Sequence, residues 1–365
     1  MTDNLSDDVL SQLHWNQQLQ MQKQHTHHQA SASIKRTPAD FIVREQLKYE
    51  LSGEGDYVYL QIQKQGINTQ DLAEQLCKWF QLPSDAVKYS GLKDRNAQTT
   101  QWFSLQTEGD LIKPETTLAN DGWEILDANR HTNPLKSGLL AGNEFELNVT
   151  VDEATAGQLQ QYDQQRLIVP NFYGMQRFGA EGENAIHGLN LLNDKQSLRK
   201  FPRKKWKFFK KLFVSSVQAG LFNLWLNQRL NDSKTLQIVA GDIVQKTTTG
   251  GMFTVEPEEL EQALERQQQG ELVVSGPIFG YRMRQPKAQA QVWEQNILDL
   301  YQWTIESFRV LGKVALGTRR PGVIVVDDLS ISPIESGVKM KFSLPAGAYA
   351  TSVLQSLVSE VESEE

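Results

Sequence analysis

Residues Val87–Leu105 read VKYSGLKDRNAQTTQWFSL, and in this stretch two strand-like segments flank a polar loop. The loop holds one carboxylate, Asp94, between Lys93 and Arg95. Gly, Asp and Asn are residues that tight turns prefer, so the loop can be an ordinary turn between two strands. It can also be a rigid support for a reactive acid, because flanking strands hold such a loop firmly at both ends.

The charges next to Asp94 favour the second interpretation. If the backbone is extended here, neighbouring side chains point to opposite faces. Lys93 and Arg95 would then face the phosphates of a polyanion while Asp94 faces a pocket. Nearby cations would also keep the carboxylate ionised, which a nucleophile requires.

The segments around the loop alternate as half-buried strands do. Apolar residues occupy every second position in DYVYLQIQK (56–64), EFELNVTV (144–151) and GVKMKFSLPAG (337–347). Between the first of these and the loop, INTQDLAEQLCKWFQLP (67–83) has an apolar stripe at helical spacing, with Asn68 or Thr69 as the N-cap. Both ends of the chain are therefore expected to contribute strands.

The middle of the chain has a different character. KKWKFFKKLFVSSVQAGLFNLWLNQRL (204–230) and EPEELEQALERQQQ (256–269) carry helical patterns. We therefore expect an α+β core built from both chain ends, with a mixed, mainly antiparallel sheet and an inserted α+β domain. The sequence leaves open the alternative of two consecutive domains.

Length and composition place the chain among ordinary globular proteins. Its 365 residues are enough for about two domains. The single cysteine, Cys77, cannot form an internal disulfide and suits a reducing compartment. The chain has no apolar run of about eighteen residues, and its N-terminus is acidic, so we expect no membrane span, no signal peptide and a cytoplasmic location.

The net charge of −7 is concentrated at the two ends of the chain. Residues 1–30 carry −2 and residues 355–365 carry −4, so −1 remains for the rest. We expect 1–30, including the HTHH tract at 25–28, to be a flexible tail and 358–365 to be an acidic tail. The HTHH tract could bind a metal, but no Cys or acidic partner lies beside it.

A basic run, defined here as residues 199–211, contains eight cations and no acid. It can be the solvated start of a helix, or an edge that contacts RNA phosphates without reading base sequence. Both can hold together, because the apolar stripe and the charges occupy different faces of the helix. The expected phosphate contacts in the run are Arg203, Lys204, Lys205 and Lys207, in addition to Lys93 and Arg95 of the loop.

Motifs for bound cofactors are missing from the sequence. NFYGMQRFG (171–179) lacks the Lys-Ser/Thr ending of a phosphate loop, and no dinucleotide fingerprint, zinc spacing or nucleophile-elbow serine is present. A metal-dependent nuclease would need several clustered acids. Asp327 and Asp328 are adjacent, so on a strand their side chains would point apart. We expect no cofactor and no required metal.

Several segments together resemble the TruD-type tRNA pseudouridine synthases. The resemblance covers about residues 31–357 and is carried by motifs in a fixed order. These motifs are IKRTPADFIVRE (34–45), SGLKDRNAQTTQWFSL (90–105), LLAGNEFEL (139–147), VPNFYGMQRFG (169–179), SSVQAGLFN (215–223) and FSLPAGAYATSVL (342–354). In the last motif the family usually has Phe where this chain has Tyr349.

The resemblance implies a fold, a reaction and a site. The fold is a pseudouridine-synthase-like catalytic domain (31–168 and 320–357) with an inserted TRUD domain (169–319) and the active site in the cleft between them. The reaction is isomerisation of uridine, expected at position 13 of tRNA, without a cofactor. Independently of the resemblance, a monomer is the default expectation. The implied site residues are Asp94 as nucleophile, Lys35 as its partner, and Phe41, Asn143, Phe145 and Tyr349 as binders of the flipped-out base.

A second class of function uses the same scaffold. A non-catalytic RNA-binding or RNA-chaperone protein would need the basic run and the aromatic residues equally. It would have no use for a carboxylate facing RNA phosphates, so Asp94 separates the two hypotheses. The sequence does not distinguish attack of Asp94 on C1′ from attack on the base.

Overall fold

The computed structural model describes residues 12–34, 37–107, 122–136, 138–174, 177–179, 182–193, 195–232 and 236–363. It is a mixed α+β structure, as predicted, and the chain divides into two compact units. The sheet unit comprises residues 29–167, 326–350 and 360–365. The helix-rich unit comprises residues 1–28, 168–325 and 351–359. Each unit is thus assembled from separate stretches of the chain.

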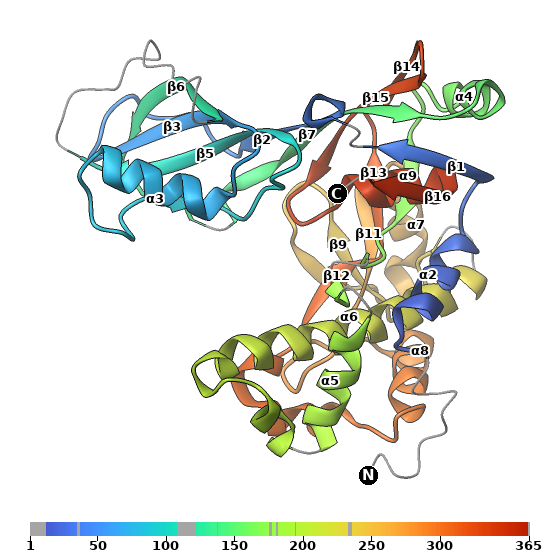
Figure 1. The fold of residues 1–365 in the computed structure, drawn as a ribbon. Coiled ribbons are helices and arrows are strands. Elements are labelled where there is room, and N and C mark those ends of the chain that lie inside the picture. Colours follow the sequence, from blue (N-terminus) through green and yellow to red (C-terminus); the bar gives the residue numbers. More distant parts are fainter. Residues whose placement is uncertain are drawn as a thin grey trace. The chain divides into compact units, whose positions relative to one another are not determined.

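The sheet unit is built on one large sheet (Figure 1). Its strands follow the order β14-β15-β7-β2-β5-β3-β6, and β1, β4 and β16 add to this path. Along this path, within the described residues, only the contact between β2 and β5 is parallel, so the sheet is mainly antiparallel. The strands are β1 (His28–Ile34), β2 (Phe41–Leu47), β3 (Tyr57–Lys64), β4 (Lys88–Tyr89), β5 (Gln98–Gln106), β6 (Trp123–His131), β7 (Leu140–Thr150), β14 (Ser330–Ile334), β15 (Gly337–Pro345) and β16 (Val358–Ser363).

The core of the sheet unit lies between its strands and helix α3 (Thr69–Trp79). Leu72 and Leu76 of α3 pack on apolar residues of β3, β5 and β6, and Figure 1 shows α3 lying along these strands. Strand β5 is buried on both faces because a smaller cluster around Tyr59 and Trp102 covers the other side. Helix α4 (Glu153–Gln160) and the short turn η2 (Pro38–Asp40) complete the regular elements of this unit.

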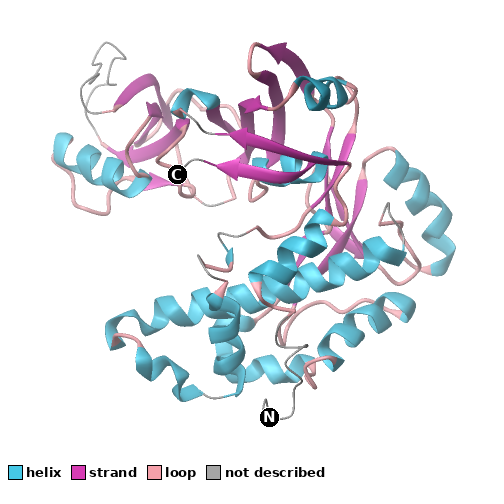
Figure 2. Ribbon diagram, turned by 45° about the vertical axis from the view of Figure 1, so that its right-hand side comes forward, coloured by secondary structure: helices cyan, strands magenta, loops and turns pink. Residues whose placement is uncertain are grey.

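The helix-rich unit is organised around α6 (Trp206–Asp232). From Phe213 onward most of its side chains are buried, which is typical of a helix surrounded by its own domain. Helices and a four-stranded sheet of order β10-β9-β11-β12 pack around it (Figure 2). The helices are α2 (Trp15–Lys23), α5 (Glu183–Asn193), α7 (Leu260–Gln268), α8 (Ala288–Asp299) and α9 (Ala350–Leu357), with 3-10 turns η4 (Lys195–Lys200), η5 (Arg203–Lys205), η6 (Pro257–Glu259) and η7 (Ile305–Ala315).

The strands of the helix-rich sheet are β9 (Ile243–Lys246), β10 (Met252–Thr254), β11 (Leu272–Ile278) and β12 (Thr318–Pro321). A separate pair, β8 (Leu167–Pro170) and β13 (Val323–Val326), forms where the chain passes from one unit to the other. The helices predicted over 204–230 and 256–269 are confirmed as α6 and as η6 followed by α7. Among the described residues, no helix combines the length and the apolar character needed to cross a membrane.

The expectation of a flexible tail over 1–30 is wrong for the described part of that segment. Helix α2 and strand β1 form there, and Leu13 is fully buried in the core around α6. Leu13 fits because Gly220 of α6 has no side chain: a Cβ at that position would lie 2.6 Å from a Leu13 methyl group. His25 of the HTHH tract bonds Asn227 at 2.9 Å and stacks on Phe172.

The C-terminal expectation also needs correction. Residues expected to form an acidic tail include strand β16, and Ser31 of β1 donates a hydrogen bond to Glu360 at 3.1 Å. Contacts with neighbouring parts of the chain hold both end segments in place. Neither segment needs an apolar stripe of its own, so the sequence shows little apolar periodicity there.

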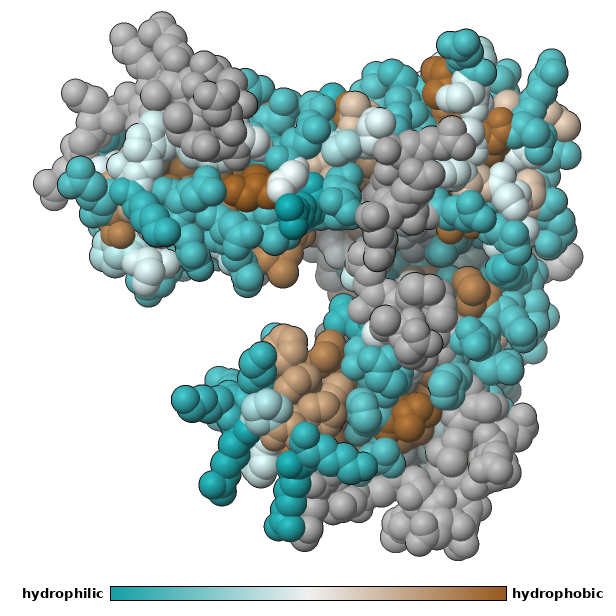
Figure 3. Space-filling view, viewed as in Figure 1, coloured by the Kyte–Doolittle hydropathy of each residue, from teal (hydrophilic) through white to brown (hydrophobic). Residues whose placement is uncertain are grey.

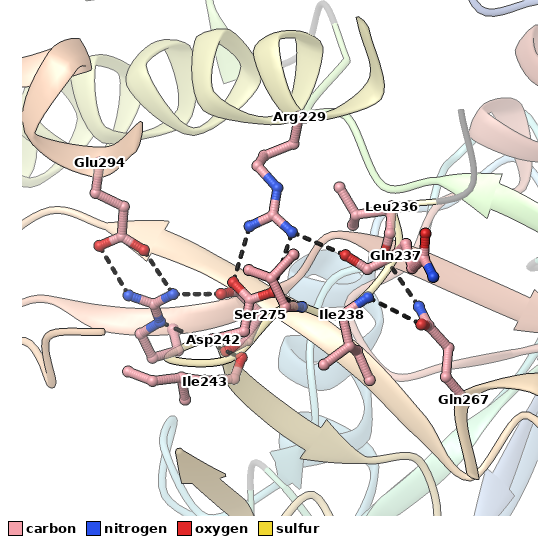
Figure 4. Close-up of polar contacts among 11 residues, drawn as sticks. Arg229, Leu236, Gln237, Ile238, Asp242, Ile243, Gln267, Ser275 and Glu294 are labelled. Carbon is pink, nitrogen blue, oxygen red and sulfur yellow. Dashed lines mark hydrogen bonds and ion pairs between the residues drawn. The ribbon is translucent and has the colours of Figure 1, made fainter. Parts of the chain in front are cut away.

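Two buried arginine–carboxylate pairs stabilise the helix-rich unit (Figure 4). Arg229 of α6 donates from Nη1 to Asp242 Oδ1 at 2.8 Å and from Nη2 to Asp242 Oδ2 at 3.0 Å. The same guanidinium lies 4.1 Å from the ring centroid of Trp293. Arg319 pairs with Glu294 at 2.7 Å, and burial raises the pKa of Glu294 to about 7 despite the opposing effect of this arginine.

We expect Arg229→Met to lower the free energy of unfolding of the helix-rich unit by about 3–5 kcal/mol, because it leaves the Asp242 carboxylate buried without its cation. Urea unfolding followed by far-UV circular dichroism measures this. A matched control is Arg309→Met, which removes an equally close but solvent-exposed pair with Glu306 and should leave the midpoint unchanged. Equal effects of the two variants would contradict the assigned role of the buried pair.

Candidate active site

The loop that carries Asp94 joins β4 to β5. The two strands predicted on either side of it are confirmed, since β4 pairs antiparallel with β5 through Lys88–Ser104 and Tyr89–Phe103. Inside the loop the backbone is fixed by side chains from neighbouring elements. The Lys93 amide donates to Thr69 Oγ1 at 2.9 Å, and Gln101 Nε2 donates to the Gly91 carbonyl at 2.9 Å.

Lys64 at the end of β3 lies beneath this loop and is 1% exposed. Its ammonium donates to the carbonyl oxygens of Ile67 at 2.9 Å and Asp94 at 3.1 Å, with a longer contact of 3.5 Å to that of Lys93. A buried ammonium needs such oxygen partners to offset the loss of its hydration.

Lys93 points into the sheet unit. Its ammonium lies 2.9 Å from Glu45 Oε1 and donates to Asn143 Oδ1 at 2.7 Å. Glu45 and Asn143 are opposite each other in the β2–β7 register, so one lysine reaches both. The carboxylate also accepts a hydrogen bond from the Trp102 amide at 2.9 Å. Burial raises the pKa of Glu45, and the neighbouring Lys93 opposes that rise.

The expectation that Lys93 faces RNA phosphates is therefore wrong for this structure. Its side chain is only 12% exposed, because the buried carboxylate of Glu45 requires a cation close by. Asn143, expected to bind the flipped-out base, has its Oδ1 engaged by Lys93 of the Asp94 loop. Arg95 remains exposed, with Nε donating to the Gly66 carbonyl at 2.9 Å.

The carboxylate of Asp94 is exposed, where the sequence suggested an enclosed cleft. Its Oδ1 accepts a hydrogen bond from the Asn96 amide at 3.0 Å, which orients the side chain relative to its own loop. Burial lowers the pKa of Lys64, and the negative charge of Asp94 opposes that shift. Lys35, the partner expected for Asp94, lies outside the described residues.

Three aromatic rings lie on the same face of the sheet as Glu45 and Asn143. Phe41 and Phe145 meet edge to face with centroids 6.2 Å apart, and Phe145 stacks on Phe342 at 5.6 Å. Phe41 and Phe145 are nearly buried, so only small parts of their rings are accessible. Tyr349 follows β15 and is half-buried.

Glu45, Lys64 and Phe342 belong to this arrangement and were not singled out from the sequence. A signal for the two charged residues was present. Lys64 continues the apolar alternation of Val58, Leu60 and Ile62, and Glu45 continues that of Phe41 and Val43. A charged residue in phase with the buried face of a strand must find a buried partner.

The adjacent acids Asp327 and Asp328 make separate contacts. Asp327 Oδ1 lies 2.5 Å from Arg166 Nε, and Asp328 Oδ1 accepts from the Ser343 amide at 3.0 Å. Within the part of the chain that the structure describes, no group of three or more His, Cys, Asp or Glu residues converges as a metal site would.

The basic run occupies η4, η5 and the first turns of α6 in the helix-rich unit. Its arginines and nearly all of its lysines are exposed, and among the described residues none of them forms an ion pair with an acid. Phe208 is 62% exposed, whereas Phe209 stacks on Phe213 of the core. Figure 3 shows hydrophobic surface over the start of α6, bordered by hydrophilic side chains.

Comparison with known proteins gives the family from sequence, and a solved structure supports the fold. The family model for tRNA pseudouridine synthase D (TruD) matches residues 19–197 and 189–357. A tRNA pseudouridine synthase D of Anaeromyxobacter sp. (strain Fw109-5) is 35% identical over 330 residues, which cover 90% of this chain and 93% of that protein. One of Legionella pneumophila (strain Corby) is 30% identical over 331 residues, covering 90% and 95%.

Among solved structures, a crystal structure from Methanosarcina mazei, of a protein assigned to tRNA pseudouridine synthase D, superposes with a TM-score of 0.71. It covers 92% of this chain and 97% of its own at 21% identity, so it supports the fold. The family model spans both units, including the loop of Asp94 and the strands of Glu45 and Asn143. The chain belongs to the TruD family of tRNA pseudouridine synthases.

Proposed function

We propose that this chain isomerises uridine to pseudouridine in tRNA, at position 13, with Asp94 as the nucleophile. The observation that carries the proposal is the family match across the chain, which includes a loop presenting an exposed carboxylate. In the reaction the N1–C1′ bond breaks, the uracil turns, and C5 bonds to C1′. The C5 hydrogen is lost and N1 gains a proton, so substrate and product are isomers.

The setting of Asp94 suits an ionised nucleophile. Its side chain is exposed to substrate, while the backbone on both sides of it is bonded to the buried Lys64. The positive charge of Lys64 favours the anionic form of a carboxyl group next to it. Attack can occur at C1′ or at the base, and either route requires the anion.

The exposure of the carboxylate fits a substrate that is delivered from a folded RNA. A base stacked in a helix must be flipped out before its N1–C1′ bond can be reached, at a cost of a few kcal/mol. Stacking on an aromatic ring offsets that cost by about 1–3 kcal/mol per base. We assign Phe41, Phe145 and Tyr349 to this contact, and the uridine itself would then cover Asp94.

Asn143 is the proposed reader of the uracil edge. Its Oδ1 is engaged by Lys93, so its Nδ2 group can donate to a uracil carbonyl oxygen. In this position Lys93 serves the site from inside the protein and orients Asn143. A purely RNA-binding protein would not need a cation, an amide and a carboxylate aligned in this way.

The basic run is the proposed contact with the tRNA backbone. Its exposed charges, which form no ion pair within the described part of the chain, include Arg203, Lys204, Lys205 and Lys207, and from the sheet unit we add Arg95. Such contacts supply affinity without sequence specificity and weaken as salt displaces them. The acidic ends of the chain do not oppose this, because a local cluster of charge determines the contact.

Asp94→Asn tests the nucleophile. The amide has nearly the same shape and can still accept from the Asn96 amide, so the fold and tRNA affinity should persist within a few-fold. Without an ionisable oxygen no covalent step can begin, and pseudouridine formation should be abolished. Single-turnover assays with unmodified tRNA, read by mass spectrometry after chemical derivatisation, measure this. Appreciable product from the variant would exclude Asp94 as the nucleophile.

The backbone contact is tested by Lys204→Gln/Lys205→Gln against the control Lys246→Gln/Lys313→Gln. Both pairs remove two exposed charges, but the control residues lie outside the basic run. We expect the first pair to reduce the slope of log Kd against log salt concentration by about 1.5, because each lost phosphate contact accounts for about 0.7–0.9. If both pairs change the slope equally, the basic run is not the contact.

A further inference from the structure

Lys64 is the one fully buried lysine in the part of the chain that the structure describes, and the proposed reaction assigns it no step. It occupies the position where the alternation of β3 calls for an apolar side chain. Removing an ammonium from water costs several kcal/mol, so an apolar residue would serve stability alone at least as well. This desolvation cost indicates that Lys64 has a role in the site.

The partners of Lys64 indicate what that role is. An ammonium has three N–H donors, and three carbonyl oxygens surround this one. Two of them, from Lys93 and Asp94, belong to the peptide groups on either side of the Asp94 Cα. Holding both peptide groups fixes φ and ψ at that residue and therefore the direction of its Cα–Cβ bond. The third, from Ile67, ties the loop to the segment that enters α3.

The charges around Lys64 form a balanced set. Asp94 and Lys93 face it from the loop and Glu45 faces it from β2. Its neighbours across the sheet are Thr99 of β5 and Trp123 of β6, which carry no charge. At the start of α3, Asp71 instead accepts a hydrogen bond from Asn68 at 3.1 Å. Two cations and two carboxylates thus share the site, and loss of Lys64 would leave a negative excess beside Asp94.

We propose that Lys64 is the positioning residue for Asp94: its ammonium clamps the two peptide groups that flank the nucleophile and thereby aims the carboxylate at the substrate. The proposal rests on the function proposed for Asp94. Lys64 itself does not touch the uridine. A misplacement of reacting groups by about 1 Å can reduce a rate about 100-fold, so a loosened loop would reduce turnover without removing the nucleophile.

The clamp should release at alkaline pH. Burial lowers the pKa of Lys64 to about 8, although Asp94 opposes this. Below that pH three N–H groups meet three carbonyl oxygens. Above it the neutral amine has two N–H groups and a lone pair, which is repelled by a carbonyl oxygen. The positioning effect is therefore present below about pH 8 and is lost as the pH rises through that value.

The test compares the intact wild-type protein with Lys64→Met in single-turnover assays on unmodified tRNA from pH 6.5 to 9.5. At pH 7 we expect the rate of the variant to fall 10- to 100-fold while its Kd for tRNA stays within twofold. The ratio of the two rates should then decline above about pH 8, as wild-type Lys64 also loses its positive charge. Titration of the uracil affects both proteins equally and cancels in the ratio.

The alternatives give distinct results. A ratio that is large but independent of pH would mean that Lys64 serves only stability, and an unchanged rate in Lys64→Met would mean that it has no role; either result overturns the proposal. Lys88→Met, at an exposed lysine of β4 before the same loop, is the matched control and should retain the wild-type rate.

Two further variants keep the test decisive. If Lys64→Met does not fold, Lys64→Arg should keep its positive charge above pH 8, and its rate relative to wild type should rise there; a flat relative rate overturns the proposal. Asp94→Asn is assayed in parallel. An active Asp94→Asn overturns the nucleophile itself, whereas an inactive one with a fully active Lys64→Met overturns only the positioning role.

Discussion

Charged groups buried at one end of the large sheet determine how the candidate site is built. Glu45 and Lys64 lie where strands β2 and β3 would otherwise present apolar side chains, and neither can hydrate there. Glu45 obtains the ammonium of Lys93, and Lys64 obtains backbone carbonyls from the loop around Asp94. Because both needs are met by the same loop, satisfying them leaves Asp94 at the surface in a defined orientation.

This arrangement separates the roles of three neighbouring residues. Lys93 points inward and orients Asn143, Asp94 stays exposed, and Arg95 stays exposed with one hydrogen bond to the Gly66 carbonyl. A loop held only by its ends would leave these directions to fluctuate. For the nucleophile proposed above, precise direction matters, because reacting groups must approach within about 3–3.5 Å in a defined alignment. Under that proposal the same hydrogen bonds serve both stability and reactivity.

The helix-rich unit also contains a buried charge that needs a partner, but there the pair stabilises the fold. Its long helix α6 has a buried second half, where Arg229 is satisfied by Asp242, and an exposed basic beginning. The buried cation is fully paired and serves the fold. The exposed cations form no ion pair with an acid among the described residues, which suits the polyanion contact proposed above. In one helix, burial separates the positive charge that serves the fold from the charges proposed to contact RNA, so net charge alone is a poor guide to function.

The sequence by itself determined much of this protein. Alternation predicted strands β3, β7 and β15, helical spacing predicted α3 and α6, and ordered motifs around Asp94 and Asn143 indicated the family. These features are local, because they depend on the period of a strand or helix and on short spacings between residues. The same local patterns predicted a flexible tail for the N-terminal segment, because α2 has no marked apolar stripe of its own.

Only the tertiary structure decided the direction of the Lys93 side chain, the burial of Lys64 and the packing of Leu13 against Gly220. In each case the partner lies far away in the chain or is a backbone carbonyl, which every residue type carries. The spacing of residues along the sequence cannot identify such partners. A charged residue in phase with a buried strand face signals that a partner exists, but only the packed sheet and its loop show which group it is.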